Sequence, residues 1–506
     1  MKNLKKLLAG ALAVTSMITV ASCNGGDRSS GGNSDGARTT TTADPAATTT
    51  EATTVAITTT HDTNKAVQEA VANLEVETSF NPTKKLKWLG NWAIDNTSAE
   101  IELFKTLYGV PEENSGDYAD NEKGLVVVSD VCDWADRYNA LGKAVAGGTP
   151  PDLFPFENDY FPLTAYKNMF QPIDGVIDTS GSEFDGWREL SDYMTWNGKH
   201  YVIPVEFYPQ WVLFYRRSII EENGFADPYE LFMNGEWTWD TFLEMADTFQ
   251  KTGESKHIID GWYTPQAIFS TTGVPFVSID KDTGKVNSNL YDPNVERAAA
   301  MVESLGREGY VRSQWFDGQV SEKAWCTGDT LFWIDGFWFY QGNGHVYAGP
   351  DGYNWGYDDV FFVPAPKDPL ADASYMAYKV YGYAFCAGST NKDGYQAMVQ
   401  CQMLTLADEN VQAASRQALM ENEMWTDTQM DFREKLYSPT ETPLSPVYEF
   451  ATGIDQANSQ QSDAPIDNIR KLCMNPDYTY VGQRAEYGPL IESPVKELNA
   501  ALGFTD

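Results

Sequence analysis

The chain has 506 residues, with 36 basic and 72 acidic side chains and a formal net charge of −36. Such an excess of carboxylates disfavours nucleic acid and anionic lipid as ligands. Six cysteines without CxxC spacing and four scattered histidines indicate neither a zinc site nor a disulfide framework, so we expect mostly buried thiols, no bound metal and no cofactor.

The first 22 residues have the features of an export signal. Three lysines precede an apolar run from Leu7 to Val20, which is too short to be a stable membrane span. Val20-Ala21-Ser22-Cys23 follows and resembles the bacterial lipobox, in which the cysteine sulfur is diacylated and the chain is cut just before it. We therefore expect lipidation at Cys23 and a mature protein anchored on the extracytoplasmic face of the cell membrane. An ordinary secretory signal with a chance cysteine and a core helix are the alternatives.

Residues 23–79 are predicted to be a flexible tether. Up to about residue 64 the segment is rich in small and polar residues and nearly free of large apolar side chains, so it buries too little surface to offset the ordering of its backbone. Thr-rich linkers of this kind also fit glycosylation. From Val67 to Leu74 a weak helical periodicity appears.

The folded part then alternates strand-like and helix-like segments. Strands are expected at Leu86–Gly90, Gly124–Val128 and Pro151–Phe154, and helices at Ser98–Tyr108 and Trp134–Gly147. This alternation predicts α/β lobes built on a largely parallel sheet. In such sheets ligands lie at the carboxyl ends of the strands.

Three local patterns follow in the second half of the chain. Thr238 is expected to cap the N-terminus of a helix. The segment Asp280–Val286 lacks the glycine and glutamate that a calcium loop needs, so we expect a hairpin turn there. Asp292 is expected to open a helix that runs to Leu305.

Six motifs stand in a fixed order along the chain. They are Gly148–Leu153, Phe170–Asp174, Tyr201–Val205 with Leu213–Arg217, Gly235–Asp240, Gly328–Trp338 and Phe362–Pro366. Their order resembles that of the family 1 extracellular solute-binding proteins of ABC importers, over about residues 84 to 410. The segment between Asn91 and Gly124 and the last 70 or so residues depart from the family pattern.

The resemblance implies an α/β, two-lobed periplasmic-binding-protein-like fold with a cleft between the lobes and several hinge crossings. One lobe is expected to comprise residues 80–204 with about 382–440, and the other 205–381 with about 441–506. Crossings are expected at Pro204–Glu206 and Lys379–Gly382. The family also implies a monomer that works with ABC permease subunits.

The ligand class follows from the aromatic residues. Fifteen tryptophans and 27 tyrosines exceed the needs of a core of this size. Sugar rings stack on aromatic planes while their hydroxyls need fixed polar partners, so an aromatic residue beside a carboxylate after a strand is the pattern to seek. Four segments fit it: Phe156–Tyr160, Glu206–Tyr208, Gly261–Tyr263 and Asp335–Trp338.

Individual ligand contacts are expected within and near these segments. The resemblance to maltodextrin-binding members places contacts at Phe156, Asp159, Glu206, Trp262, Tyr263 and Trp338, and near Trp92. Tyr208 and Asp335 are added from the four segments, and Tyr383 from the expected return crossing. The alternatives are that each tryptophan is a packing residue, that Glu206 is a hinge ion-pair partner, and that Tyr383 is a packed strand residue. Trp237 and Trp239 are expected in the core.

These observations predict a lipid-anchored binding protein that captures a carbohydrate, an oligosaccharide in particular, for an ABC import permease. No catalytic residue is expected. An extracellular glycoside hydrolase is the first alternative, with Glu157 and Asp159 as its carboxylate pair. A binding protein for a peptide, polyamine or metal chelate is the second.

Overall fold

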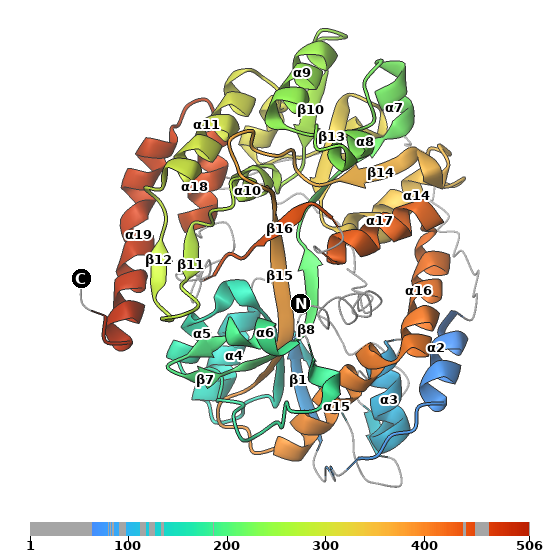
Figure 1. The fold of residues 1–506 in the computed structure, drawn as a ribbon, viewed down its shortest axis with the longest axis vertical. Helices are drawn as coiled ribbons and strands as arrows, with labels where there is room; N and C mark the ends of the chain where they lie inside the picture. Colours follow the sequence, from blue (N-terminus) through green and yellow to red (C-terminus); the bar gives the residue numbers. More distant parts are fainter. Residues whose placement is uncertain are drawn as a thin grey trace, which may run out of the picture.

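Two lobes are stacked along the long axis of the molecule (Figure 1). The structure is a computed structural model that describes residues 63–78, 80, 82, 85–90, 98–111, 118–120, 127–132, 136–185, 187–438, 442–450 and 465–504. None of the helices formed by these residues combines the length and apolar character that a membrane span requires.

The first lobe, drawn at the bottom of Figure 1, is built on part of a six-stranded mixed sheet whose strands β8, β15 and β16 extend between the lobes. Its strands follow the order β16-β15-β5-β1-β4, and β8 pairs with β15 beside this path. β1 is parallel to β4 and β5, whereas β15 is antiparallel to both β5 and β8. The bounds are β1 Leu86–Gly90, β4 Val127–Val131, β5 Leu153–Glu157, β8 Val202–Pro209, β15 Ser374–Phe385 and β16 Leu444–Val447.

The second lobe is built on a four-stranded sheet of order β10-β13-β9-β14. β10 and β13 are parallel, and β9 is antiparallel to β13 and β14. The sheets are therefore mixed, not largely parallel as expected, because strands that cross between lobes pair in the antiparallel direction. The bounds are β9 Val212–Arg216, β10 His257–Asp260, β13 Thr330–Asp335 and β14 Val360–Val363.

Helices surround both sheets. Around the first lie α2 Thr63–Ala72, α3 Ala99–Tyr108, α4 Arg137–Ala146, α5 Leu163–Tyr166, α6 Trp187–Asp192, α15 Lys392–Ala407 and α16 Glu409–Glu423. Around the second and beside it lie α7 Arg217–Glu222, α8 Pro228–Met233, α9 Trp239–Gln250, α10 Thr264–Ser270, α11 Pro293–Arg307, α12 Glu322–Cys326, α13 Phe337–Phe339, α14 His345–Ala348, α17 Asp427–Tyr437, α18 Pro465–Met474 and α19 Tyr480–Ala501.

Shorter elements complete the fold. The single-turn helices are η2 Asn158–Tyr160, η3 Ser182–Phe184, η4 Ser313–Asp317, the π-helical η5 Tyr340–Gly344 and η6 Tyr357–Asp359. The two-stranded hairpins are β2 Gly109–Pro111 with β3 Tyr118–Asp120, β6 Thr195–Trp196 with β7 Lys199–His200, and β11 Val277–Ile279 with β12 Val286–Ser288.

Most expected elements occur close to their predicted places. β1 has the predicted bounds, and α3 begins one residue later than predicted. The Thr238 hydroxyl accepts the backbone N–H of Thr241 and caps α9, and Asp292 caps α11. β11 and β12 form the predicted hairpin, whose turn uses Gly284 at a positive φ of 74°. β4 lies three residues later than expected.

The N-terminal helix α2 corrects the predicted length of the tether. Val67 and Val71 are 3% and 2% exposed, and the helix packs against α16 and α3. The Gln68 amide donates to the Glu102 carboxylate at 3.3 Å. Two valines four residues apart form a narrow apolar stripe, which is enough to hold a short helix on a neighbouring helix pair. The prediction of a flexible tether is thus wrong for residues 63–72.

The two predicted crossing segments lie side by side. Tyr381 of β15 pairs with Glu206 of β8, and the next residue, Gly382, pairs with Pro204 across a register shift. A Cβ atom on Gly382 would lie 2.5 Å from the carbonyl oxygen of Ile203, so only glycine permits this close strand contact. The irregularity falls where the strands leave the first sheet, a place where bulges commonly bend strands.

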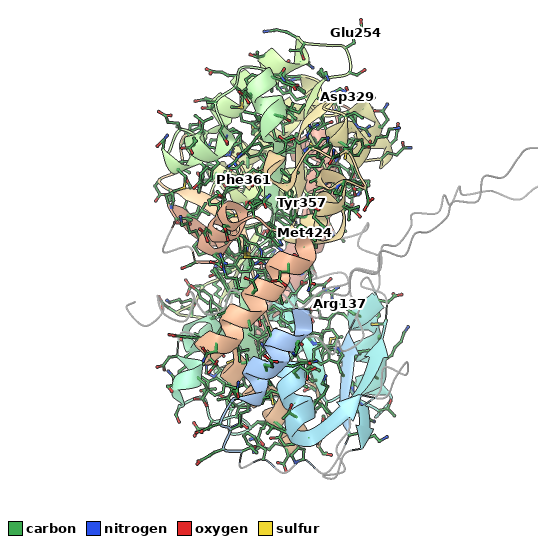
Figure 2. The ribbon with its side chains drawn as sticks, turned by 90° about the vertical axis from the view of Figure 1, so that its right-hand side faces the viewer. Arg137, Glu254, Asp329, Tyr357, Phe361 and Met424 are labelled. Carbon is green, nitrogen blue, oxygen red and sulfur yellow. The ribbon has the colours of Figure 1, made fainter. Side chains whose placement is uncertain are left out.

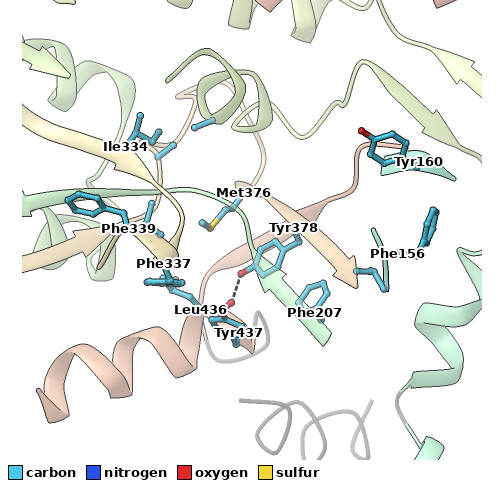
Figure 3. Packing of buried hydrophobic residues seen from close by; sticks show 14 of the residues in the cluster. Phe156, Tyr160, Phe207, Ile334, Phe337, Phe339, Met376, Tyr378, Leu436 and Tyr437 are labelled. Atoms are coloured by element: carbon cyan, nitrogen blue, oxygen red, sulfur yellow. Dashed lines mark hydrogen bonds between the residues drawn. The ribbon is translucent and has the colours of Figure 1, made fainter. Parts of the chain in front are cut away.

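Aromatic packing fixes the crossing strands to α17. Phe207 of β8 stacks on Tyr378 of β15, with ring centroids 4.6 Å apart and 10° between the planes. The Tyr378 hydroxyl donates to the carbonyl oxygen of Leu436 at 2.5 Å (Figure 3). Both rings are almost fully buried. The packing of these two rings ties the crossing strands to α17.

Candidate functional site

Five polar side chains share one face of the first sheet where it approaches the second lobe. Glu206, Tyr381 and Glu157 stand opposite one another on β8, β15 and β5. Tyr208 lies two residues after Glu206 on β8, and Lys379 lies two residues before Tyr381 on β15. Tyr208 and Lys379 are also paired. Because side chains alternate along strands and paired residues point to the same face, all five lie together.

Glu157 is the centre of a buried charge network. Its Oε2 accepts from Arg137 Nη2 at 3.1 Å and from Lys379 Nζ at 3.0 Å, and its Oε1 accepts from the Tyr208 hydroxyl at 3.1 Å. Burial alone would raise the pKa of Glu157, but the charges of Lys379 and Arg137 outweigh it and hold that pKa below its usual value. Glu157 is therefore an ionised, fully engaged carboxylate.

Glu206 has the opposite character. Burial raises its pKa to about 8, with Arg433 opposing the shift and the neighbouring Glu100 and Glu157 adding to it. No described residue donates a hydrogen bond to the Glu206 carboxyl. The side chain is only partly buried, so this carboxyl group has hydrogen-bonding capacity that the protein itself does not use.

Aromatic rings face this polar group from the second lobe. Trp211, between β8 and β9, stacks on Tyr263 with centroids 5.4 Å apart and 19° between planes. Tyr263 in turn meets Trp338 edge-on at 5.9 Å. All three residues are partly exposed. Burial raises the pKa of Tyr263, and the carboxylates that add to the shift, Asp335 and Glu157 among them, come from both sheets.

The aromatic residues are placed by the ends of two parallel strands. Tyr263 follows β10 and Trp338 follows β13, at the carboxyl ends where α/β sheets bind ligands. The Trp338 ring lies directly over Gly336, where a Cβ atom would come 2.0 Å from it. Burial raises the pKa of Asp335, at the end of β13, to about 7, with the Gly336 N–H opposing the shift.

Gly261 fixes the turn that presents Tyr263. It has a φ of 120°, and a Cβ atom there would lie 2.4 Å from the backbone oxygen of Ile334. We expect Gly261→Ala to lower the free energy of unfolding by about 2 kcal/mol or more in urea titrations. Gly284→Ala is the control, since Gly284 also has a positive φ but faces open space, and should cost only about 1 kcal/mol. Equal losses would contradict the steric explanation.

Six of the expected contact residues lie at this site or beside it. They are Glu206, Tyr208, Trp262, Tyr263, Asp335 and Trp338. Trp262 is at the margin, 40% exposed, with its ring 6.3 Å from that of Trp315. Trp92 and Cys23 lie outside the described residues, as does the side chain of Asp159, whose backbone belongs to η2.

Two expected contacts are corrected by the structure. Phe156 is 0% exposed and packs against Phe170, because it points away from the face that carries Glu157. Tyr383 is 3% exposed, and its hydroxyl donates to Gln402 at 2.9 Å. Tyr383 is two residues further into the first sheet than Tyr381 and lies beneath α15. Both are core residues, as are Trp237 and Trp239, whose burial confirms the expectation for them.

Other residues of the site were missed in the sequence. Arg137, Lys379 and Trp211 were not expected to contact ligand. Only Trp211 carries a local signal, an aromatic residue five positions after the predicted crossing Pro204–Glu206. Arg137 is 2% exposed in α4 and Lys379 lies mid-strand, so their meeting at Glu157 depends on the tertiary fold.

Charge, hydrogen-bonding capacity and aromatic surface are the chemical features of the site. Within the described ranges, no group of three or more His, Cys, Asp or Glu side chains could hold a metal ion. The five described cysteines are free thiols, four of them buried and Cys132 partly so, as expected. The arrangement combines one fixed charge network, one carboxyl group free to bond and three aromatic faces, which suits binding of an uncharged polar ligand.

Comparisons with known proteins agree with the two-lobed fold. The sequence profile described as bacterial extracellular solute-binding protein matches residues 112–403. No curated protein matches the sequence. The GacH receptor of Streptomyces glaucescens GLA.O, solved unliganded and with acarbose, is 14% identical with a TM-score of 0.56, over 82% of this chain and 99% of its own.

Two further solved structures are similar. The sugar-binding protein MalE from Xanthomonas citri is 14% identical with a TM-score of 0.57, over 84% of this chain and 100% of its own. The cyclic alpha-maltosyl-1,6-maltose binding protein from Arthrobacter globiformis is 12% identical with a TM-score of 0.58, over 82% and 100%. At these identities the likeness establishes the architecture, two α/β lobes joined by crossing strands.

Proposed function

The chain belongs to the bacterial extracellular solute-binding proteins, and on that basis we propose that it captures a carbohydrate between its lobes and delivers it to an ABC import permease. The observation that carries the carbohydrate assignment is the carboxyl group of Glu206. It accepts no hydrogen bond from a described residue, and it shares its sheet face with Glu157, whose charge acts on Tyr263 in the aromatic group of Trp211, Tyr263 and Trp338.

The chemistry of a sugar fits both the aromatic rings and the carboxyl group of the site. The apolar C–H faces of a pyranose stack on aromatic planes, and its hydroxyls donate to carboxyl and carbonyl oxygens. A protonated Glu206 can also donate, because its pKa of about 8 keeps it largely neutral at pH 7. The similar proteins with acarbose, maltose-type or other sugar ligands support the same ligand class.

The mechanism we propose is closure of the lobes around the ligand. Motion occurs about the paired segments Pro204–Glu206 and Lys379–Gly382. Ligand contacts both lobes and so favours the closed form by its differential affinity. We propose the lobe bounds predicted from the sequence, with one change at the boundary expected near residue 440. Phe432 of α17 stacks on Phe361 of β14, so we propose that the last crossing precedes α17.

We also propose that Cys23 carries a diacylglycerol anchor and that the following Thr-rich segment is a tether. Two acyl chains suffice for stable anchoring. A flexible chain of about 40 residues reaches a few nanometres, at about 5–6 Å times the square root of its length. The anchor then retains the binding protein beside its permease. Palmitate labelling of wild type and Cys23→Ala in a bacterial host tests it, and labelling of both variants would refute it.

Calorimetric titration of the whole mature chain tests the carbohydrate assignment. The panel contains maltose, maltotetraose, acarbose, galactose and a peptide mixture. We expect saturable binding of at least one sugar and no sugar breakdown on prolonged incubation. Binding of the peptides alone, or release of hydrolysis products, would overturn the proposal.

Trp338 provides a direct probe of the site. We expect Trp338→Ala to weaken sugar binding by about 1–3 kcal/mol, the range for one large apolar side chain, without changing the thermal unfolding of the free protein greatly. The control is Tyr291→Ala, since Tyr291 is 66% exposed and belongs to neither sheet edge at the site. Wild-type affinity in Trp338→Ala would remove this residue from the site.

A further inference from the structure

A second group of exposed and partly exposed apolar residues, three of them aromatic, lies on the upper lobe. Tyr353 is 44% and Val346 46% exposed, and Tyr347 and Trp355 are partly exposed beside them. We call these four residues the outer shelf. The shelf belongs to the segment that follows Trp338, and none of its residues takes part in the site described above.

The ring of Tyr353 is held in a fixed position. It stacks on Trp355 with centroids 5.0 Å apart and 17° between planes, and Tyr347 meets it edge-on at 6.1 Å. Burial raises the pKa of the Cys326 thiol, and Tyr353 is among the groups near enough to affect it. The Tyr353 ring is therefore held between two aromatic neighbours while the residue remains 44% exposed.

Fixed polar groups flank the ring. The Glu322 carboxylate accepts from the Tyr347 hydroxyl at 2.6 Å and from the Asn343 amide at 3.2 Å. Asn343 is exposed and Glu322 partly so. A pre-positioned carboxylate and amide beside an exposed ring is the same combination that the cleft presents to a sugar. The shelf is small and rimmed by polar residues, so it is poorly suited to a protein partner.

The outer shelf is also close to the cleft. Helices α13, η5 and α14 form one continuous helical run from Phe337 to Ala348. Trp338 and Val346 are eight residues apart on it, which corresponds to about 12 Å at 1.5 Å per residue. Tyr357, just beyond the shelf in sequence, lies in the lower half of the upper lobe, toward the lobe junction (Figure 2).

We propose that the outer shelf contacts the part of a long oligosaccharide that extends out of the cleft, with Tyr353 as its stacking platform. This inference rests on the proposed carbohydrate function. It makes the shelf a determinant of chain length: short ligands occupy only the cleft, and long ones gain a contact with Tyr353.

Binding of short and long ligands separates the two sites. Titration of the whole mature chain with maltose and maltoheptaose is compared for wild type, Tyr353→Ala, Tyr353→Phe and Tyr478→Ala. Tyr478, 45% exposed in the turn between α18 and α19, is the matched control. Tyr353→Ala should weaken maltoheptaose binding about tenfold, equivalent to about 1.4 kcal/mol, and leave maltose binding within about twofold.

Tyr353→Phe keeps the ring and should bind both ligands as wild type does, and so should Tyr478→Ala. Asn343→Ala removes an exposed amide that donates to Glu322, and it should weaken maltoheptaose binding alone. This variant serves as the test if Tyr353→Ala folds poorly. Equal losses for both ligands, or no loss for maltoheptaose in either variant, would overturn the inference while leaving the carbohydrate function in place. Binding of monosaccharides alone would also overturn the inference and leave the carbohydrate function in place. Failure of every sugar to bind would remove the proposed function itself.

Discussion

Replacing Arg137 by methionine is expected to lower the free energy of unfolding by about 3 kcal/mol at neutral pH. Arg137 is 2% exposed and donates to Glu157, which is 7% exposed. Methionine keeps the apolar stem of arginine but removes its charge, so one of the two cations that compensate the buried carboxylate is lost. Breaking a buried ion pair in this way costs about 3–5 kcal/mol, and the remaining Lys379 places the effect at the lower end.

The pH dependence of this loss identifies its cause. In the wild type the pKa of Glu157 is held below its usual value, so its contribution to stability is present above the ordinary carboxyl pKa and disappears as the pH falls through the folded one. Without Arg137 the pKa of Glu157 rises. The variant then protonates Glu157 earlier on acidification, and the stability gap to wild type should narrow from about pH 7 to about pH 4.

Urea titrations at several pH values measure this gap. The control is Arg307→Met, because the pair of Arg307 with Glu308 is 60% and 54% exposed, and exposed pairs contribute less than about 1 kcal/mol. The double variant Arg137→Met with Glu157→Gln should recover part of the loss, since the buried charge itself is then gone. A gap that is independent of pH would show that packing, not charge, explains the role of Arg137.

The same network shows how far the sequence could predict the site. Glu206 and Tyr208 were expected together because both belong to a segment that follows a predicted strand. The alternation of side chains along a strand separates Phe156 from Glu157, but it does not say which of the two faces the core. All five residues of β5 are buried, so hydrophobicity alone offers no choice between the faces.

Longer-range features lay beyond local patterns. Lys379 reaches Glu157 over 222 positions and through the pairing of β15 with β5. The register shift at Gly382 brings Glu206 opposite Tyr381 and leaves Tyr383 deeper in the sheet, under α15. No periodicity in the sequence predicts where such a shift falls. In contrast, the ends of β10 and β13 were predictable, because glycine and aromatic residues directly follow short apolar runs.

Glu206→Gln is expected to remove a loss of stability that wild type undergoes as the pH rises. This change in the pH dependence is opposite to the one expected for Arg137→Met. The pKa of Glu206 is raised from 4.5 to about 8 by burial, so the folded state holds the proton more tightly than the unfolded state. Wild-type stability should therefore fall as the pH rises from about 4.5 to about 8, as the folded protein is forced to ionise this group. Glutamine has nearly the same shape and does not ionise, so the variant lacks this decline.

Between about pH 5 and about pH 8, the free energy of unfolding of wild type should fall by about 2 kcal/mol relative to that of Glu206→Gln. The full pKa shift would correspond to a larger fall, but solvent in the cleft screens the charge of Glu206. Asp335 and Glu423, whose pKa values burial raises to about 7, titrate in both proteins. Their contributions cancel when the two stability curves are subtracted. The subtraction thus isolates Glu206.

The matched control is Glu254→Gln, because Glu254 is exposed at the far tip of the upper lobe (Figure 2). Its stability curve should run parallel to that of wild type. Parallel curves for Glu206→Gln as well would mean that solvent or a neighbouring cation compensates the ionised carboxylate. Divergence confined to the range between about pH 5 and about pH 8 would instead establish a neutral Glu206 at pH 7. A neutral carboxyl both donates and accepts hydrogen bonds, and it offers an uncharged sugar no net charge to desolvate.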